Sequence, residues 1–269
     1  MSRVIFRISA GFLVGSLVFL ATMLSLSQYY LNEEARLFAG GDLRGALDAV
    51  QMAARLDPFD AESLEGESFI LEQQGRYEAA ASSLRSAIER DPHNYIPYLM
   101  LGNLQFSQLD DLDGAIESYR DVLRLNPKAT VASSSLANAL LRKRDLEAAK
   151  KVYEKLENEK SISFQGLYNL GRIYVRTGQP GKGLKTIRRA KHMAEAGLGK
   201  LNGPLKAQRQ QLIESMQLAI ADALVVQRRY TAARRIIAGS TSEQAPALLQ
   251  LLDSNPEAYR ESVVTSEIY

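Results

Sequence analysis

The chain has 269 residues, 46% of them hydrophobic, and a formal net charge of +2. This composition excludes wholesale disorder and allows one or two domains with a buried core. Cysteine is absent, which excludes disulfides, zinc–thiolate sites and thiol catalysis, and the scarcity of aromatic residues (7%) favours helices over strands.

The N-terminal segment predicts a membrane anchor. Residues 8–32 carry no charge, and their apolar core of about 20 residues is long enough to cross about 30 Å of hydrocarbon as a helix. Arg3 and Arg7 precede this core and favour a cytoplasmic N-terminus by the positive-inside rule. We therefore expect a cytoplasmic N-terminus over 1–7 and a transmembrane anchor over 8–30.

A cleaved signal peptide is the alternative interpretation of this segment. Ser25, Leu26 and Ser27 offer small residues at a spacing suited to cleavage. However, the apolar stretch is longer than the usual core of a signal peptide. With either interpretation, the rest of the chain lies outside the cytoplasm of a bacterial cell.

The next two hundred residues repeat with a period near 34. The segments GDLRGALDAVQMAARLDP, GRYEAAASSLRSAIERDP and DDLDGAIESYRDVLRLNP align without a gap, and each places a small residue twelve positions before a proline. Small residues continue in this register at Ala46, Ala80, Ala115, Ala149 and Gly183, in steps of 34, 35, 34 and 34, and at Ala233 after 50. The longer last step indicates an insertion, which we place at 191–204.

A second pattern lies about twelve residues before the small residue of each later unit. It reads LGNLQF from Leu101, LANALL from Leu136, LGRIYV from Leu170 and IADALV from Ile220. Together the two patterns resemble the tetratricopeptide repeat, in which a Leu-Gly helix pairs with a helix that carries a small residue and ends at a proline. Such spacing is physically sensible, because two helices approach closely only where both carry small side chains, and proline ends a helix.

The resemblance implies an all-α solenoid of about six helical hairpins, preceded by the single transmembrane helix. It covers residues 31–239, and the expected units are 31–60, 61–94, 95–129, 130–163, 164–196 and 205–239. Stacked repeats of this kind contact mainly their neighbours. For 240–269 we expect a capping helix near 245–252 and a flexible tail.

The stretch TGQPGKGLKT at 177–186 has the glycines and lysines of a phosphate-binding loop. However, Leu184 and Lys185 follow Gly183 where that loop needs Lys and a hydroxyl residue, and a helix, not a strand, is expected before it. We therefore interpret it as the elbow of the fifth repeat. Since glycine weakens a helix relative to alanine, the sequence predicts that Gly183→Ala stabilises the protein.

Nothing in the sequence forms a recognisable catalytic, cofactor-binding or metal site. DDLDGAIE resembles the start of a calcium loop, but Leu109 and Arg120 occupy its first and last ligand positions. The histidines, His93 and His192, fall in expected loops without a catalytic partner. We expect a protein that is not an enzyme and that uses no cofactor.

The resemblance also implies where partners bind, because the first helix of each tetratricopeptide unit faces the concave surface. The expected partner-binding residues on that surface are Asn103, Phe106, Asn138, Arg142, Tyr168, Arg172 and Arg176. Asparagine amides can bracket a peptide backbone, and arginines can pair with carboxylates through two hydrogen bonds. A chaperone-type carboxylate clamp is not expected, because Leu99 and Ser134 stand where it needs lysine.

These features predict a membrane-anchored scaffold or assembly factor of a cell-envelope complex. Its repeats are expected on the periplasmic side of an inner membrane, where they bind proteins or extended, acidic peptides. A targeting or import receptor facing the cytosol remains an alternative. So does a self-assembling protein, because residues 31–130 carry 9 basic and 18 acidic side chains whereas residues 131–240 carry 21 basic and 8 acidic ones. Nucleic acid is not expected as a partner, since the basic runs lack interleaved aromatic residues.

Overall fold

The computed structural model describes residues 2–266, with only the backbone given for residues 2–12. Within residues 2–266 all regular secondary structure is helical, so the predicted all-α fold is confirmed. The chain divides into two compact units, residues 1–128 and 129–269, and each is described here by itself.

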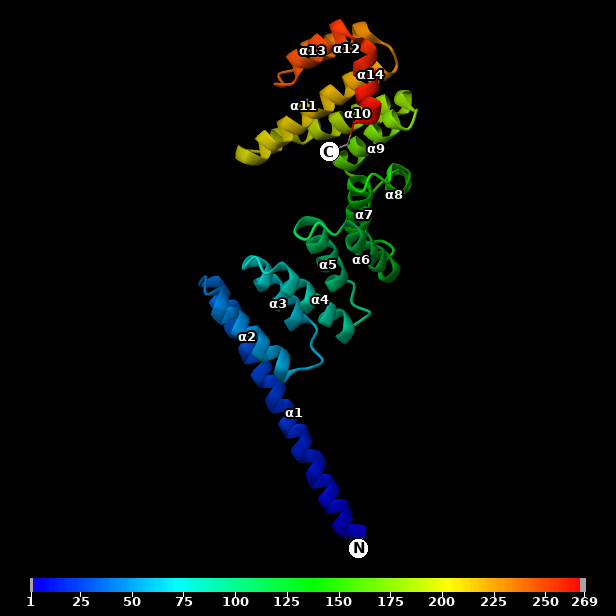
Figure 1. Ribbon diagram of the computed structural model, residues 1–269. Coiled ribbons are helices and arrows are strands. Elements are labelled where there is room, and N and C mark those ends of the chain that lie inside the picture. Colours follow the sequence, from blue (N-terminus) through cyan, green and yellow to red (C-terminus); the bar gives the residue numbers. More distant parts are fainter. Residues whose placement is uncertain (1, 267–269) are drawn as a thin grey trace. The chain divides into compact units, whose positions relative to one another are not determined.

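The first unit consists of three helical hairpins (Figure 1). Its helices are α1 (Ser2–Ala39), α2 (Leu43–Leu56), α3 (Glu62–Gln73), α4 (Tyr77–Arg90), α5 (Ile96–Ser107) and α6 (Leu112–Leu125). Each helix packs against the next along the chain through α5 and α6. This nearest-neighbour packing is the arrangement expected of a repeat protein.

The second unit continues the hairpin pattern, with its two longest helices in the middle and three short ones at its end. It contains α7 (Thr130–Arg142), α8 (Leu146–Asn158), α9 (Phe164–Arg176), α10 (Pro180–Ala196), the short 3-10 helix η1 (Leu198–Lys200), α11 (Gly203–Val226), α12 (Tyr230–Ala238), α13 (Ala245–Ser254) and α14 (Pro256–Thr265). The expected insertion lengthens α10 and α11 and adds η1 between them.

The elbows between paired helices use residues that tolerate a left-handed backbone. Gly41, Gly75 and Gly178 have φ angles of +81°, +72° and +79°, a region that glycine enters at little cost. An aspartate then begins the next helix in some repeats; the Asp42 side chain, for example, accepts a hydrogen bond from the amide of Gly45. Because a helix precedes Gly178 and another begins at Pro180, TGQPGKGLKT is an elbow, as predicted.

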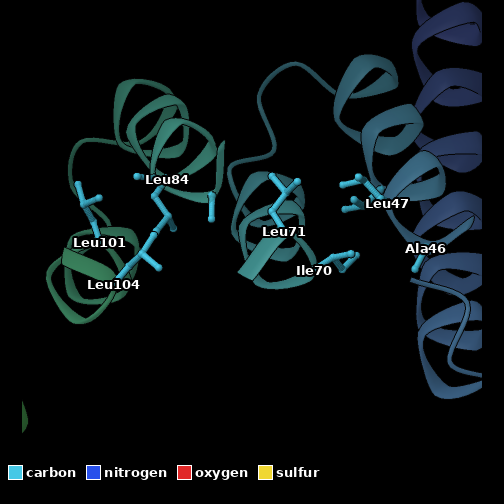
Figure 2. Close-up of a cluster of buried hydrophobic side chains, with 10 residues drawn as sticks. Ala46, Leu47, Ile70, Leu71, Leu84, Leu101 and Leu104 are labelled. Carbon is cyan, nitrogen blue, oxygen red and sulfur yellow. The ribbon is translucent and has the colours of Figure 1, made fainter. Parts of the chain in front are cut away.

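The core of the first unit runs continuously from α2 to α5. Figure 2 shows leucines, an isoleucine and an alanine from these four helices pointing into one cluster. Ala46 and Ala80, two of the small residues that define the repeat, are fully buried there. A larger side chain at either position would have to displace the facing helix, so the small residue is a packing requirement of each hairpin.

In the fifth repeat both facing positions are glycine, and α9 and α10 approach closely. A methyl group added to Gly183 would lie 2.7 Å from the carbonyl oxygen of Gly171 and 2.6 Å from Cγ2 of Val175. Backbone atoms cannot move aside as a flexible side chain can. The prediction that Gly183→Ala stabilises the protein is therefore wrong, because the glycine pair permits a contact that alanine would prevent.

Helix α1 is a single helix that extends well beyond the end of α2 (Figure 1). Its described part from Leu13 to Ala39 is long and apolar enough to cross a membrane, by length and composition, and only 6% of the apolar window is buried. The C-terminal half of α1 instead packs against α2, and the Ser27 hydroxyl donates a 3.2 Å hydrogen bond to the carbonyl oxygen of Ala53. The same helix thus provides both an exposed apolar rod and the first helix of the solenoid.

Candidate protein-binding surface

The predicted concave surface takes one inward position from the first helix of each repeat, directly after the Leu-Gly or Leu-Ala pair. Asn103 on α5 belongs to the first unit, whereas Asn138 on α7 and Arg172 on α9 belong to the second. The residues near them along the same helices are Phe106, Arg142, Tyr168 and Arg176. The two units present these side chains in different surroundings.

In the first unit, Asn103 is exposed but partly engaged. Its carboxamide oxygen accepts a 2.9 Å hydrogen bond from the hydroxyl of Tyr119 on α6. Tyr119 is buried against Gly102, where an added methyl group would lie 2.8 Å from the tyrosine ring. The amide nitrogen of Asn103 has no hydrogen-bond partner among residues 13–266 and can therefore donate to a bound peptide. Phe106, half-buried nearby on α5, adds an apolar side chain.

Asn138 is more tightly held than the sequence suggested. Its carboxamide oxygen accepts hydrogen bonds from the hydroxyl of Tyr153 on α8, at 2.5 Å, and from the amide nitrogen of Asn169 on α9, at 3.3 Å. Asn169 also donates to the Tyr153 hydroxyl at 3.1 Å. This network joins three helices. The carboxamide oxygen of Asn138 is therefore used in packing the helices and is not available to a ligand. Arg142, one turn further along α7, is half-buried.

Tyr168 and Arg172 line a pocket of about 510 Å³ within the second unit. The Arg172 guanidinium lies 5.1 Å from the centre of the Tyr168 ring, a cation–π contact. It makes no hydrogen bond or ion pair within the described part of the chain, although its side chain is half-buried. The remaining walls come from α11 and the segment before α13, and include Gln211, Glu214, Ser215, Leu218, Asp222 and residues 241–244.

Arg176 has a different environment, because the C-terminal helix covers it. Its Nε donates to the carbonyl oxygen of Ser266, and its Nη2 donates to the Ser266 hydroxyl, both at 3.1 Å. The expected flexible tail is therefore wrong for 256–265. These residues form α14, which packs against α9 and α11 and buries Tyr259 and Val263.

Burial changes the acid–base properties of this region. The protein around Asp222 removes water from its carboxylate and raises its pKa, although Tyr259, Arg176 and Arg172 oppose the shift. Burial lowers the pKa of Arg176 to about 10, with a further contribution from the neighbouring charge of Arg172. Arg176 therefore remains charged at neutral pH. The pKa of the Tyr168 phenol is raised, chiefly by burial, so this hydroxyl is a neutral hydrogen-bond donor.

Asp222 also belongs to this set of positions, although it was not among the predicted residues. It follows Ile220 and Ala221 just as Arg172 follows Leu170 and Gly171, so the repeat register alone identifies it. Helix α14 was likewise not predicted. Its sequence signals are Asn255 and Pro256, which form the helix cap and the first helical residue.

Comparisons with known proteins support the fold. The tetratricopeptide repeat profile matches residues 35–95, 69–130, 99–162 and 134–197. The crystal structure of MamA aligns with a TM-score of 0.58 and 21% identity, over 66% of this chain and 97% of that chain. For YrrB, described as a TPR protein with an unusual peptide-binding site, the TM-score is 0.53 and the identity 21%, over 61% and 84% of the two chains.

A third solved structure extends the similarity over more of the chain. It is a tetratricopeptide repeat protein from Parabacteroides merdae ATCC 43184, with a TM-score of 0.55 and 16% identity over 86% of this chain and 100% of that chain. At such identities these structures show the shared fold alone, and no curated protein sequence matches. The profile matches, in contrast, together span residues 35–197, more than half of the sequence. The chain therefore belongs to the tetratricopeptide repeat family.

Proposed function

We propose that the protein is a membrane-anchored scaffold or assembly factor that binds protein partners of a cell-envelope complex through the inner faces of its repeats. Helix α1 is the single-pass anchor, with its N-terminus in the cytoplasm and the repeats on the periplasmic side of the inner membrane. Membership of the tetratricopeptide repeat family and the exposed apolar part of α1 support this proposal. We assign no catalytic step and no cofactor to it.

Partner binding in this proposal rests chiefly on the Arg172 guanidinium, which makes no hydrogen bond or ion pair with residues 13–266. A half-buried arginine that lines a pocket and donates no hydrogen bond to a carboxylate of the described residues has lost part of its hydration without full compensation. A carboxylate from a ligand would restore that loss with two charge-assisted hydrogen bonds. The Tyr168 ring already holds the guanidinium in place, which lowers the entropic cost of binding.

The pocket favours an extended peptide that presents one carboxylate. Glu214 and Asp222 also line it and would repel a densely acidic ligand, but their oxygens can accept hydrogen bonds from peptide amides. In the first unit, Asn103 and Phe106 offer a comparable donor and apolar contact. Peptide binding by a related fold is described for YrrB, which supports this assignment.

Partner recovery tests the binding site. Full-length wild type and Arg172→Glu would be purified from detergent-solubilised membranes, and the co-purifying proteins would be quantified. We expect Arg172→Glu to lose the specific partners. Arg188→Glu is the matched control, because Arg188 is exposed on α10, outside the pocket, and its substitution changes the charge equally. Equal partner recovery with all three proteins would exclude the Arg172 pocket as the binding site.

The reactivity of single introduced cysteines tests the orientation of the protein in the membrane. Because the chain has no cysteine of its own, each label reports on one position. Lys200→Cys, at an exposed position in η1, should react with a membrane-impermeant maleimide at the outer face of the inner membrane. Ser2→Cys should react only after the membrane is opened. The reverse pattern would indicate a receptor that faces the cytosol.

A further inference from the structure

The packing of α1 on α2 shows where the exposed part of the anchor ends. Every described side chain from Leu13 to Thr22 is exposed, and Met23 is the first that is partly covered. Further along, Ser27 contacts Ala53. The two helices run antiparallel, so residues later in α2 lie beside residues earlier in α1. The end of α2 and the loop after it therefore lie beside Thr22 and Met23.

This register changes the expected membrane boundary. A transmembrane span over 8–30 would place the last turn of α2, with its polar backbone ends, inside the hydrocarbon, where unsatisfied backbone groups are costly. The part of α1 that precedes this level is the segment 2–22. Its 21 residues extend about 32 Å as a helix, at about 1.5 Å per residue, which is close to a hydrocarbon core of about 30 Å. Arg3 and Arg7 lie near its cytoplasmic end, where long basic side chains can extend to the headgroups.

The 57–60 loop follows α2 and carries the most exposed large hydrophobic side chain among the described residues. Phe59 is 85% exposed. The loop that presents it is held in place: the Phe59 amide donates to the Asp57 carboxylate at 3.1 Å, and Arg90 donates to the carbonyl oxygen of Asp60 at 2.8 Å. An aromatic ring held in water by an ordered loop carries an unfavourable hydration cost unless something covers it.

We propose that the 57–60 loop lies on the membrane surface and that Phe59 inserts its ring into the lipid interface, so that the first repeat rests directly on the bilayer. This inference depends on the proposed anchoring by α1. Phenylalanine side chains of segments that lie on a membrane bury their rings at the boundary between headgroups and acyl chains. Because Asp57 and Asp60 flank the ring, the lipid partner is a zwitterionic phospholipid surface, and the contact does not require anionic headgroups.

Site-specific fluorescence in phosphatidylcholine vesicles tests the proposal with the full-length chain. An environment-sensitive fluorophore would be attached to single cysteines at position 18 in α1, position 58 beside Phe59 and position 73. Gln73 is the control, because it is exposed at the far end of α3, about 17 Å along the helix axis from Glu62. Vesicles would carry nitroxide quenchers either in the acyl chains or at the headgroup.

We expect the label on Val18→Cys to be quenched from the acyl chains and the label on Pro58→Cys to be quenched from the headgroup region, with no quenching at Gln73→Cys. Adding Phe59→Ser to Pro58→Cys should reduce quenching to the level at position 73. Quenching at 18 but not at 58 would overturn the membrane contact while leaving the anchor intact. Undiminished quenching with Phe59→Ser would exclude insertion of the ring. No quenching at 18 would contradict the proposed anchor itself.

Discussion

The hydroxyl of Tyr259 on α14 donates a 2.8 Å hydrogen bond to the carboxylate of Asp222 on α11. Asp222 occupies the inward position of the sixth repeat, so the C-terminal helix binds the solenoid at a position equivalent to those where we predict partner binding in the other repeats. Tyr259 is 2% exposed, so water cannot easily reach Asp222 and replace this hydrogen bond when the hydroxyl is removed.

Tyr259→Phe should therefore loosen α14. Loss of a hydrogen bond to a charged acceptor costs about 1.5–3 kcal/mol, so amide exchange in α14 should become about tenfold faster or more. Hydrogen exchange measured peptide by peptide would show the change. Tyr230→Phe is the comparison: it removes an exposed hydroxyl that donates to Glu257 on α14, where water can take its place, and it should speed exchange in α14 much less.

Asp222 also makes the stability of the second unit depend on pH. Its folded pKa lies above the ordinary value of 3.8, so at pH values between the unfolded and the folded pKa the folded state holds a proton that the unfolded chain has released. The resulting stabilisation is fully present below pH 3.8 and is lost as pH rises through the folded pKa. Urea unfolding should therefore show wild type losing stability relative to Asp222→Asn as pH rises above about 4. A difference that grows in favour of wild type with rising pH would contradict this assignment.

Two neighbouring glycines in α10 should respond oppositely to alanine. Gly183→Ala places a methyl group against the backbone of α9 and should destabilise the protein by about 1–3 kcal/mol. Gly181→Ala meets nothing within 4 Å and should stabilise it by about 0.5–1 kcal/mol through the higher helix propensity of alanine. Thermal melting of both variants gives the comparison, and stabilisation by Gly183→Ala would show that α9 and α10 are further apart than described.

Replacing Asn138 and Asn103 by alanine should lower the free energy of unfolding by different amounts. Asn138→Ala removes an acceptor from Tyr153, which is 1% exposed, and should cost about 1–3 kcal/mol in unfolding free energy. Asn103→Ala should cost less, because Asn103 is exposed and water can reach the Tyr119 hydroxyl in its place. Chemical denaturation of both variants measures the difference. Equal losses would mean that Asn103 is as structural as Asn138.

The repeat fold was predictable because small residues recur where helices must approach. Ala46, Ala80 and their counterparts carry this information locally, and the steps of 34 and 35 residues expose it without knowledge of any contact. Gly183 shows the limit of such reasoning. Its residue type was recognised correctly, but the sign of its effect on stability depends on how closely α9 approaches, which no local pattern records.

The candidate site was less predictable, because contacts distant in sequence decide how each side chain is used. Arg172 and Arg176 stand one turn apart on α9 and look equivalent in the sequence. In the structure Arg176 bonds to Ser266, 90 residues away, whereas Arg172 lines an open pocket. The acidic tail was interpreted as flexible because the surface that receives Tyr259 and Val263 is formed only by folding.

Helix α1 runs without interruption from Ser2 to Ala39, and α2 is fastened along its second half. Because α1 is one continuous helix, a change in the tilt of its N-terminal part also tilts its C-terminal part. In bilayers of different thickness, a helix of fixed apolar length adjusts its tilt, and the first hairpin must then turn with it because no hinge separates the two. With α1 as the anchor, a change in membrane thickness changes the tilt of α1, and the orientation of the first unit relative to the membrane changes with it.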